Sequence, residues 1–300
     1  MTTREVAEYL RIKERKVYDL VRLKRIPCTR VTGKLLFPKN LIDEWVGQGT
    51  AFPDLKPAVL APAPAPAPAI VAGSHDPLLD WCLRESGSGL AMMPGGSLDG
   101  VRRLVDAEAM LAGMHVFEPE TATYNQHTVE EACHGVPGGL DTVLIEWAWR
   151  QQGLILTAGN PLAIKQISDL RDKKARVIVR QPDAGSRILF RHLLAQAGMV
   201  EEDLDIFDAP ARSETDLGLA IVDGKVDAGL AVETVARQYR LDFLGLHRER
   251  YDLLIRRRDY FEPPVQRLLQ FFATEAFRAK ASEMAGYDVS GLGRVIANAA

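Results

Sequence analysis

Four hydroxyl side chains of this 300-residue sequence stand at the predicted starts of helices. The four residues are Ser74, Ser97, Ser186 and Thr215. Glycine directly precedes Ser74 and Ser186, and glycine lets the backbone approach a ligand closely. The free N–H groups at a helix start carry positive partial charge. Hydroxyl and N–H donors gathered in this way would bind a small anion.

Each hydroxyl taken alone is also consistent with ordinary N-capping, which contributes about 1 kcal/mol per helix. The order of the segments favours a ligand site. A hydroxyl, a helix, a second hydroxyl, a second helix and a strand containing Ala-Gly occur once from Ser74 to Gly113 and again from Ser186 to Gly229. The number of residues between the start of the first copy at Ser74 and the start of the second at Ser186 is far too large for a solenoid repeat. It predicts two similar lobes with the anion held between them.

Strand-like segments alternate with amphipathic helical stretches over residues 70–300, which is typical of an α/β domain with largely parallel sheets. The predicted strands are "LAMM", "MLAGMH", "TVLI", "LILT", "RVIV", "AGLAV" and "DLLI".

Five segments of this region resemble a known family: "GSHDPLLDW", "PGGSLDGVRRLVDAEAMLAGMH", "PDAGSRILFRHLLAQAG", "ETDLGLAIVDGKVDAGLAVE" and "LLIRRRDYFEPPVQRLLQFF". Residues 70–290 look like a bilobal type II periplasmic-binding-protein domain, specifically the PBP-like domain similar to molybdate-binding proteins of ABC importers. The resemblance implies an oxyanion held by Ser74 and Ser97 from lobe one, and by Ser186 and Thr215 from lobe two. It favours molybdate or tungstate as the effector and implies no cofactor.

The same resemblance implies that two crossover strands, near Ile145–Leu156 and Val232–Leu246, connect the lobes. Lobe one would comprise residues 70–150 and 240–300, and lobe two residues 151–239.

Three charged or titratable residues depart from a site made of neutral donors. His75 and His115 stand beside motif positions, and Arg187 follows Ser186. Arg187 would suit a carboxylate, a sulfonate or a phosphate through bidentate pairing, so a small organic anion stays open as the alternative effector. Each histidine is equally consistent with a structural, hydrogen-bonded role. The histidines and cysteines show no metal-ligand spacing, so we expect no metal bound by side chains.

Residues 1–47 form a separate basic head. Thr2 and Glu5 fit a capping box, and helices are expected near residues 3–10, 14–23 and 40–46. Strands over Cys28–Val31 and Lys34–Phe37 would flank a tight turn at Thr32-Gly33. Helix, turn, helix and a β-wing is a DNA-reading arrangement, in which the second helix enters the major groove. The predicted DNA contacts are Arg15, Lys16, Tyr18 and Arg22 from the helix, and Arg30 and Lys34 from the wing.

The segments "EVAEYL", "VYDLV", "IP" and "FPKNLIDEWV" fall in the order found in the excisionase-like winged helix-turn-helix family, which is related to the MerR DNA-binding domain. The resemblance covers essentially the whole head and implies binding to double-stranded DNA.

Charge and composition separate the head from the rest of the chain. Residues 1–46 contain eleven Lys or Arg against six Asp or Glu, a net charge of +5, whereas the whole chain carries −3. Only the head is therefore expected to meet a polyanion. Residues 48–69 include "LAPAPAPAPAI", which predicts an extended Ala/Pro-rich linker at about 3.1 Å per residue. Three scattered cysteines and no signal peptide or apolar span favour the cytoplasm and no membrane partner.

A DNA-reading head joined to a ligand-binding domain predicts a one-component transcriptional regulator. A symmetric homodimer on a two-part operator is expected, because the head is small. An enzyme is the less favoured class, because Ser74-His75 and Ser186-Arg187 are sequence neighbours and form no nucleophile–base pair. A third class, an architectural DNA binder, would bind DNA regardless of small anions.

Overall fold

The computed structural model describes residues 1–31, 34–48, 67–136 and 139–299. The chain divides into two compact units, Met1–Ala65 and Pro66–Ala300, which we call the head and the body. Of the predicted linker, residues 49–66 lie outside the described residues.

The head has the elements that its sequence predicts. They are α1 (Thr3–Tyr9), α2 (Glu14–Arg22), β1 (Thr29–Val31), β2 (Lys34–Leu36) and α3 (Lys39–Gln48). The capping box of α1 is present, with Thr2 N donating to Glu5 Oε2 at 2.7 Å and Glu5 N donating to Thr2 Oγ1 at 3.3 Å. Strands β1 and β2 pair in antiparallel fashion, and the predicted turn residues Thr32 and Gly33 lie outside the described ones.

A small apolar core holds the head elements together. Val6 of α1, Val17 of α2, Phe37 after β2 and Ile42 of α3 are fully buried in it. Leu41, the neighbour of Ile42 on α3, is exposed. The core therefore fixes α2 by its Val17 face and leaves the opposite, basic face in solvent.

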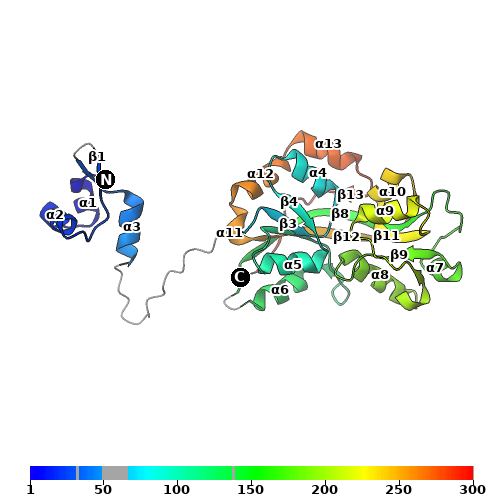
Figure 1. The fold of residues 1–300 in the computed structure, drawn as a ribbon. Helices are drawn as coiled ribbons and strands as arrows, with labels where there is room; N and C mark the ends of the chain where they lie inside the picture. The colour runs from blue at the N-terminus through cyan, green and yellow to red at the C-terminus, as the bar shows by residue number, and fades with distance from the viewer. Residues whose placement is uncertain (32–33, 49–66, 137–138, 300) are drawn as a thin grey trace. The chain divides into compact units, whose positions relative to one another are not determined.

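The body alternates strands and helices throughout (Figure 1). Its first half contains β3 (Ile70–Gly73), α4 (Pro77–Glu85), β4 (Ala91–Pro94), α5 (Ser97–Val105), β5 (Leu111–Met114), β6 (Phe117–Glu118), β7 (Thr123–Tyr124), α6 (Gln126–His134), β8 (Thr142–Leu156), α7 (Asp169–Asp172) and β9 (Arg176–Ile178). Its second half contains α8 (Gly185–Gln196), the 3-10 helix η1 (Glu201–Asp203), β10 (Asp205–Ile206), α9 (Glu214–Val222), β11 (Ala228–Val232), α10 (Glu233–Tyr239), β12 (Asp242–Arg256), α11 (Arg257–Tyr260), α12 (Pro263–Phe271), α13 (Glu275–Glu283), β13 (Tyr287–Asp288) and β14 (Val295–Ala299).

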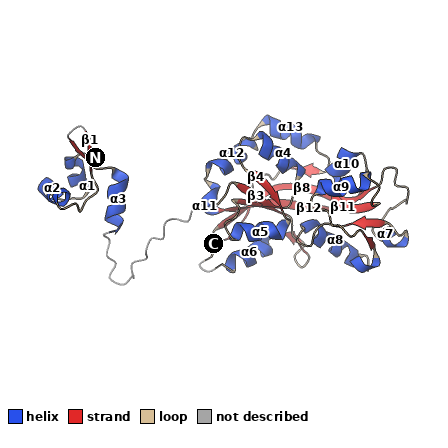
Figure 2. Ribbon diagram, in the orientation of Figure 1, coloured by secondary structure: helices blue, strands red, loops and turns tan. Residues whose placement is uncertain are grey.

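One sheet runs through the described part of the body in the order β10-β9-β11-β8-β12-β5-β3-β4, with β13 and β14 also paired to β8. The outer pairs are parallel, namely β3 with β4 and β5, and β9 with β10 and β11. The central pairs of β8 and β12 are antiparallel. Helices cover both faces, with α4, α9, α10, α12 and α13 on one side of the strands and α5, α6 and α8 on the other (Figure 2).

Strands β8 and β12 are the two long segments that cross the body. Strand β8 joins "TVLI" and "LILT" into one strand and contains the first predicted crossover. The second prediction, Val232–Leu246, is placed too early, because α10 occupies Glu233–Tyr239 and the strand runs over Asp242–Arg256. The polar residues His247–Asp252 lie in the middle of β12, so a search for apolar runs does not recognise this segment as one long strand. Among the described residues, no helix is long and apolar enough to cross a membrane.

Candidate functional site

Ser74 and Ser97 meet in the interior of the body. Ser74 follows β3 and Ser97 is the first residue of α5, and their Oγ atoms are 2.8 Å apart. The backbone N–H of His115 donates to Ser97 Oγ at 3.1 Å. Gly73 makes this approach feasible, because it has φ +101° and a Cβ there would lie 2.3 Å from Gly113 O.

None of the four predicted hydroxyls is used as a helix N-cap. Asp76 caps α4, Gly96 precedes α5, Ala184 precedes α8, and Ser213 caps α9. Ser186 is 1% exposed, and its Oγ has no hydrogen-bond partner among the described residues. The N-capping alternative therefore fails here, and a buried hydroxyl stays available for a ligand.

The two histidines take different positions. His115 is buried, its Nδ1 lies 2.8 Å from Glu249 Oε2, and its ring stacks on that of Tyr251. His75 is half-buried, and its Nδ1 has no partner in the described part of the chain. Burial lowers the pKa of His75, although the nearby charge of Asp76 acts in the opposite direction.

Arg187 and Thr215 are not brought to this group. The Arg187 guanidinium pairs with Glu201 at 2.8 and 3.0 Å and donates to the carbonyl of Arg180. Thr215 is the second residue of α9, which Ser213 caps through Asp216 N. The charged group expected beside Ser186 is therefore already paired within the protein.

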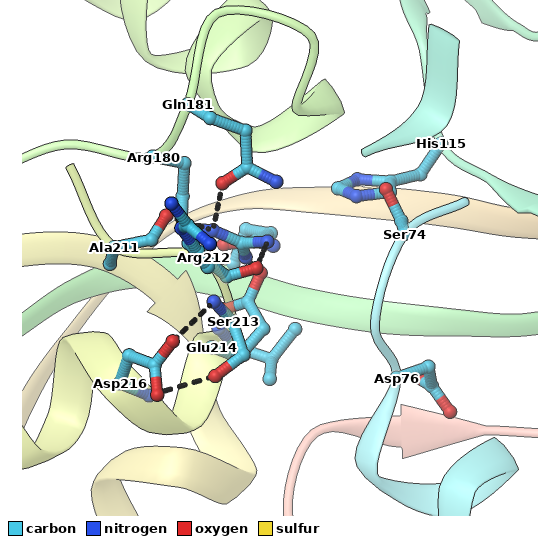
Figure 3. A network of polar contacts seen from close by, with 12 residues as sticks. Ser74, Asp76, His115, Arg180, Gln181, Ala211, Arg212, Ser213, Glu214 and Asp216 are labelled. Carbon is cyan, nitrogen blue, oxygen red and sulfur yellow. Dashed lines mark hydrogen bonds and ion pairs between the residues drawn. The ribbon is translucent and has the colours of Figure 1, made fainter. Parts of the chain in front are cut away.

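Arg180 belongs to a buried network that the sequence did not predict. Its Nη1 donates to Glu214 Oε1 at 2.9 Å, and its other nitrogens donate to the carbonyls of Ala211 and Arg212 at 3.1 Å. Figure 3 shows Arg180 and Gln181 on one side of a gap, with Ser74 and the His115 ring on the other. Polar side chains therefore lie on both sides of the gap.

A second unpredicted network lies beneath Ser74 and His115. The fully buried Arg150 of β8 donates to Asp76 Oδ2 at 2.7 Å and pairs with Glu249 of β12. It also lies over the ring of Tyr251, at 4.5 Å from the centroid. The only signal in the sequence is that the largely apolar run "TVLIEWAWRQQGLIL" contains two charged residues, Glu146 and Arg150.

The N-termini of α5 and α8 are in close contact. Leu98 N donates to Asp183 O at 3.3 Å. A Cβ on Gly185 would lie 2.5 Å from His115 O and 3.0 Å from Ser97 Oγ. The segment before Ser186 therefore packs directly on the Ser97 segment, and the two halves of the predicted site meet.

The pKa of Glu249 predicts an acid-sensitive stability. Burial alone would raise this pKa, but Arg150 and His115 outweigh burial and lower it from 4.5 to about 2. A depressed carboxyl pKa stabilises the fold fully above pH 4.5, and this stabilisation is lost as the pH falls toward 2. We expect urea unfolding to show that the stability gap between wild type and Glu249→Gln narrows over this range. The exposed control Glu283→Gln should follow wild type, and a gap independent of pH would contradict the assignment.

The predicted DNA-binding face of the head is exposed. Arg15, Lys16, Tyr18 and Arg22 all project from α2 into solvent, and Arg22 pairs loosely with Asp19 at 3.6 Å. The backbones of Arg30 and Lys34 lie in β1 and β2, and their side chains lie outside the described ones.

Comparisons with known proteins match both units. Residues 82–273 match a family described as a PBP superfamily domain, and residues 1–50 match one described as a helix-turn-helix domain. The first match lies within residues 70–290 and the second covers the whole head, so both family resemblances drawn from the sequence are confirmed.

Two curated relatives and one solved structure extend the comparison. The chain is 23% identical over 304 residues to "Uncharacterized protein YvgK" of Bacillus subtilis, covering 98% of this chain and 97% of that protein. It is 24% identical over 110 residues to an uncharacterized protein of Clostridium pasteurianum from the 5' region of a ferredoxin gene, covering 36% of this chain and 97% of that protein. The sulfate-binding protein SubI of Mycobacterium tuberculosis superposes with a TM-score of 0.51 at 16% identity, covering 74% of this chain and 85% of that one. This likeness shows a shared bilobal fold.

Proposed function

Because the chain belongs to the PBP superfamily and carries a helix-turn-helix domain at its N-terminus, we propose that it is a one-component transcriptional regulator whose body senses a small anion. The head binds double-stranded DNA through α2 and the β1–β2 wing. The anion binds between the lobes, lobe one being residues 70–150 and 240–300 and lobe two residues 151–239.

The observation that carries the anion site is the set of buried hydroxyls without a capping role. Ser186 Oγ is buried and unpartnered, and the glycine before it packs on Ser97, which contacts Ser74. The nearby carboxylates do not compete for the ligand, because Asp76, Glu249 and Glu214 already accept hydrogen bonds from this protein's own donors. Donors that remain at helix starts favour an anion.

Molybdate or tungstate is the effector that the sequence resemblance implies, and a small organic anion is the alternative. SubI is a sulfate-binding protein, but its likeness extends to the fold alone, so the choice of anion depends on the residues of this chain. The proposal includes a cytoplasmic, non-enzymatic protein that forms a symmetric homodimer on a two-part operator. Ligand binding must favour one DNA-binding geometry over another, since otherwise nothing is regulated.

Two substitutions separate the two activities. Arg15→Ala should weaken DNA binding about 5- to 150-fold, the range for one direct base contact, and leave anion binding intact. Ser186→Ala should weaken anion binding by at least about fivefold, because a buried hydrogen bond is lost, and leave DNA affinity without ligand intact. Calorimetry with molybdate, tungstate, sulfate and phosphate measures anion binding, and fluorescence anisotropy with a duplex selected from a random pool measures DNA binding.

Two exposed residues give matched controls. Arg171→Ala removes an exposed arginine of the body, and Ser282→Ala removes an exposed serine of α13. Both variants should behave as wild type in both assays. Loss of both activities in Arg15→Ala and Ser186→Ala, with lowered thermal stability, would show that these residues act only in folding.

A further inference from the structure

Gln181 lies in the turn that leads from β9 into α8. Its backbone carbonyl accepts a hydrogen bond from Ala184 N at 3.0 Å. The carbonyl of the preceding residue, Arg180, accepts one from Arg187 Nη1 at 3.1 Å. The backbone that carries the Gln181 side chain is therefore held by hydrogen bonds from two later residues of the same segment.

The side-chain amide of Gln181 is oriented by Arg180. Arg180 Nε donates to Gln181 Oε1 at 3.3 Å. A guanidinium has donors only, so the oxygen of the amide must face Arg180, and the nitrogen must point away from it. Figure 3 shows this nitrogen, Nε2, directed across the gap toward the side that holds Ser74 and the His115 ring. Gln181 therefore presents an N–H donor to the gap.

Arg180 itself is engaged within the protein. It is 3% exposed, and its three nitrogens donate to Ala211 O, to Glu214 Oε1 and to Arg212 O. Gln181 is only half-buried, and within the described ranges its Nε2 donates to no other residue. Arg180 is therefore a positioning residue, and the donor that stays available is Gln181 Nε2.

The facing side of the gap presents the linked hydroxyls of Ser74 and Ser97. We infer that Gln181 is a ligand-binding residue, whose Nε2 donates a hydrogen bond to an oxygen of the anion opposite Ser74. The inference rests on the proposed function and adds a donor from residues 151–239 to it. An anion bound by donors from both sides would hold the two lobes together, as in a hinge closure.

Gln181→Glu separates contact with the ligand from support of Arg180. The two side chains have nearly the same shape, and a carboxylate also accepts from Arg180, so the support is kept. The carboxylate offers the anion no donor and repels it. We expect the affinity for the anion that wild type binds to fall about 100-fold or more. Calorimetry of the full chain at pH 7 with molybdate, sulfate and phosphate measures this affinity.

Two further variants complete the test. Gln181→Leu removes the donor without adding a charge and should weaken anion binding about tenfold or more. Gln196→Glu makes the same change of charge at the exposed last residue of α8 and should bind as wild type does. Thermal unfolding without anion should show Gln181→Glu to be as stable as wild type.

The outcomes distinguish this inference from the proposed function. If Gln181→Glu binds the anion as tightly as wild type, Gln181 only supports Arg180, and the inference is overturned while the proposed function stands. An equal loss in Gln196→Glu would assign the effect to net charge and would also overturn it. If Gln181→Glu melts below wild type, Gln181→Leu decides, and unchanged affinity in that variant overturns the inference. Failure of wild type to bind any of the three anions overturns both the inference and the anion site.

Discussion

Arg150→Met is expected to lower the free energy of unfolding of the body by about 3–5 kcal/mol, because breaking a buried ion pair leaves its partners charged and unpaired. Here two carboxylates, Asp76 and Glu249, would lose their shared partner, and all three residues are fully buried. For a unit of this size the loss corresponds to a fall in melting temperature of roughly 10 °C. Thermal unfolding followed by circular dichroism measures it.

Two further variants show whether charge is the cause. Arg84→Met removes an arginine that pairs with Asp80 on the surface of α4, with its side chain 61% exposed, and should cost less than about 1 kcal/mol. Adding Glu249→Gln to Arg150→Met should recover part of the loss, because one unpaired charge is removed. An Arg150→Met protein as stable as wild type would contradict the role of the network.

Gly185→Ala is expected to weaken anion binding by about 5- to 150-fold, which is the effect of about 1–3 kcal/mol of overpacking. The added Cβ would lie 2.5 Å from His115 O, so the contact between the α5 and α8 N-termini could not form as it stands. In the proposed regulator the two lobes separate when no anion is bound, so the thermal stability without ligand should change little. Calorimetry with the anion that wild type binds, together with thermal unfolding without it, checks both statements.

Gly135→Ala is the matched control. Gly135 ends α6 with an ordinary helical φ of −67°, and a Cβ there would meet its nearest atom at 3.5 Å. This variant should bind the anion as wild type does. If Gly185→Ala bound the anion with unchanged affinity, ligand binding would not require the contact between the N-termini of α5 and α8.

The head could be predicted from the sequence almost completely, because its signals are local. The Thr2–Glu5 capping box and the apolar stripe through Val17 lie within single helices. Only one side of the short helix α3 reaches the core, so Ile42 is buried while its neighbour Leu41 is exposed. In the body, the predicted strands and the pairing of Ser74 with Ser97 followed from local patterns and from the family resemblance.

The charged interior could not be predicted, because it joins residues that are distant in the sequence. Arg150 and Glu249 meet only when β8 pairs with β12, and Asp76 reaches Arg150 from the segment between β3 and α4. No local spacing relates the three residues. Arg187 was chosen because it follows Ser186, but on a helix adjacent residues point in different directions. Its side chain reaches Glu201 and the carbonyl of Arg180.

The pairing of β8 with β12 also fixes the order in which the chain can complete its fold. The central strand β8 cannot complete its pairing until β12 (Asp242–Arg256) and then β14 (Val295–Ala299) have been synthesised, because both strands pair with it. Such non-local pairings form slowly, and chains fold from the N-terminus during synthesis. The head is a compact unit of its own, so it can be finished on the ribosome while the body is still incomplete. A chain released early would carry a folded helix-turn-helix domain without a ligand site to govern it.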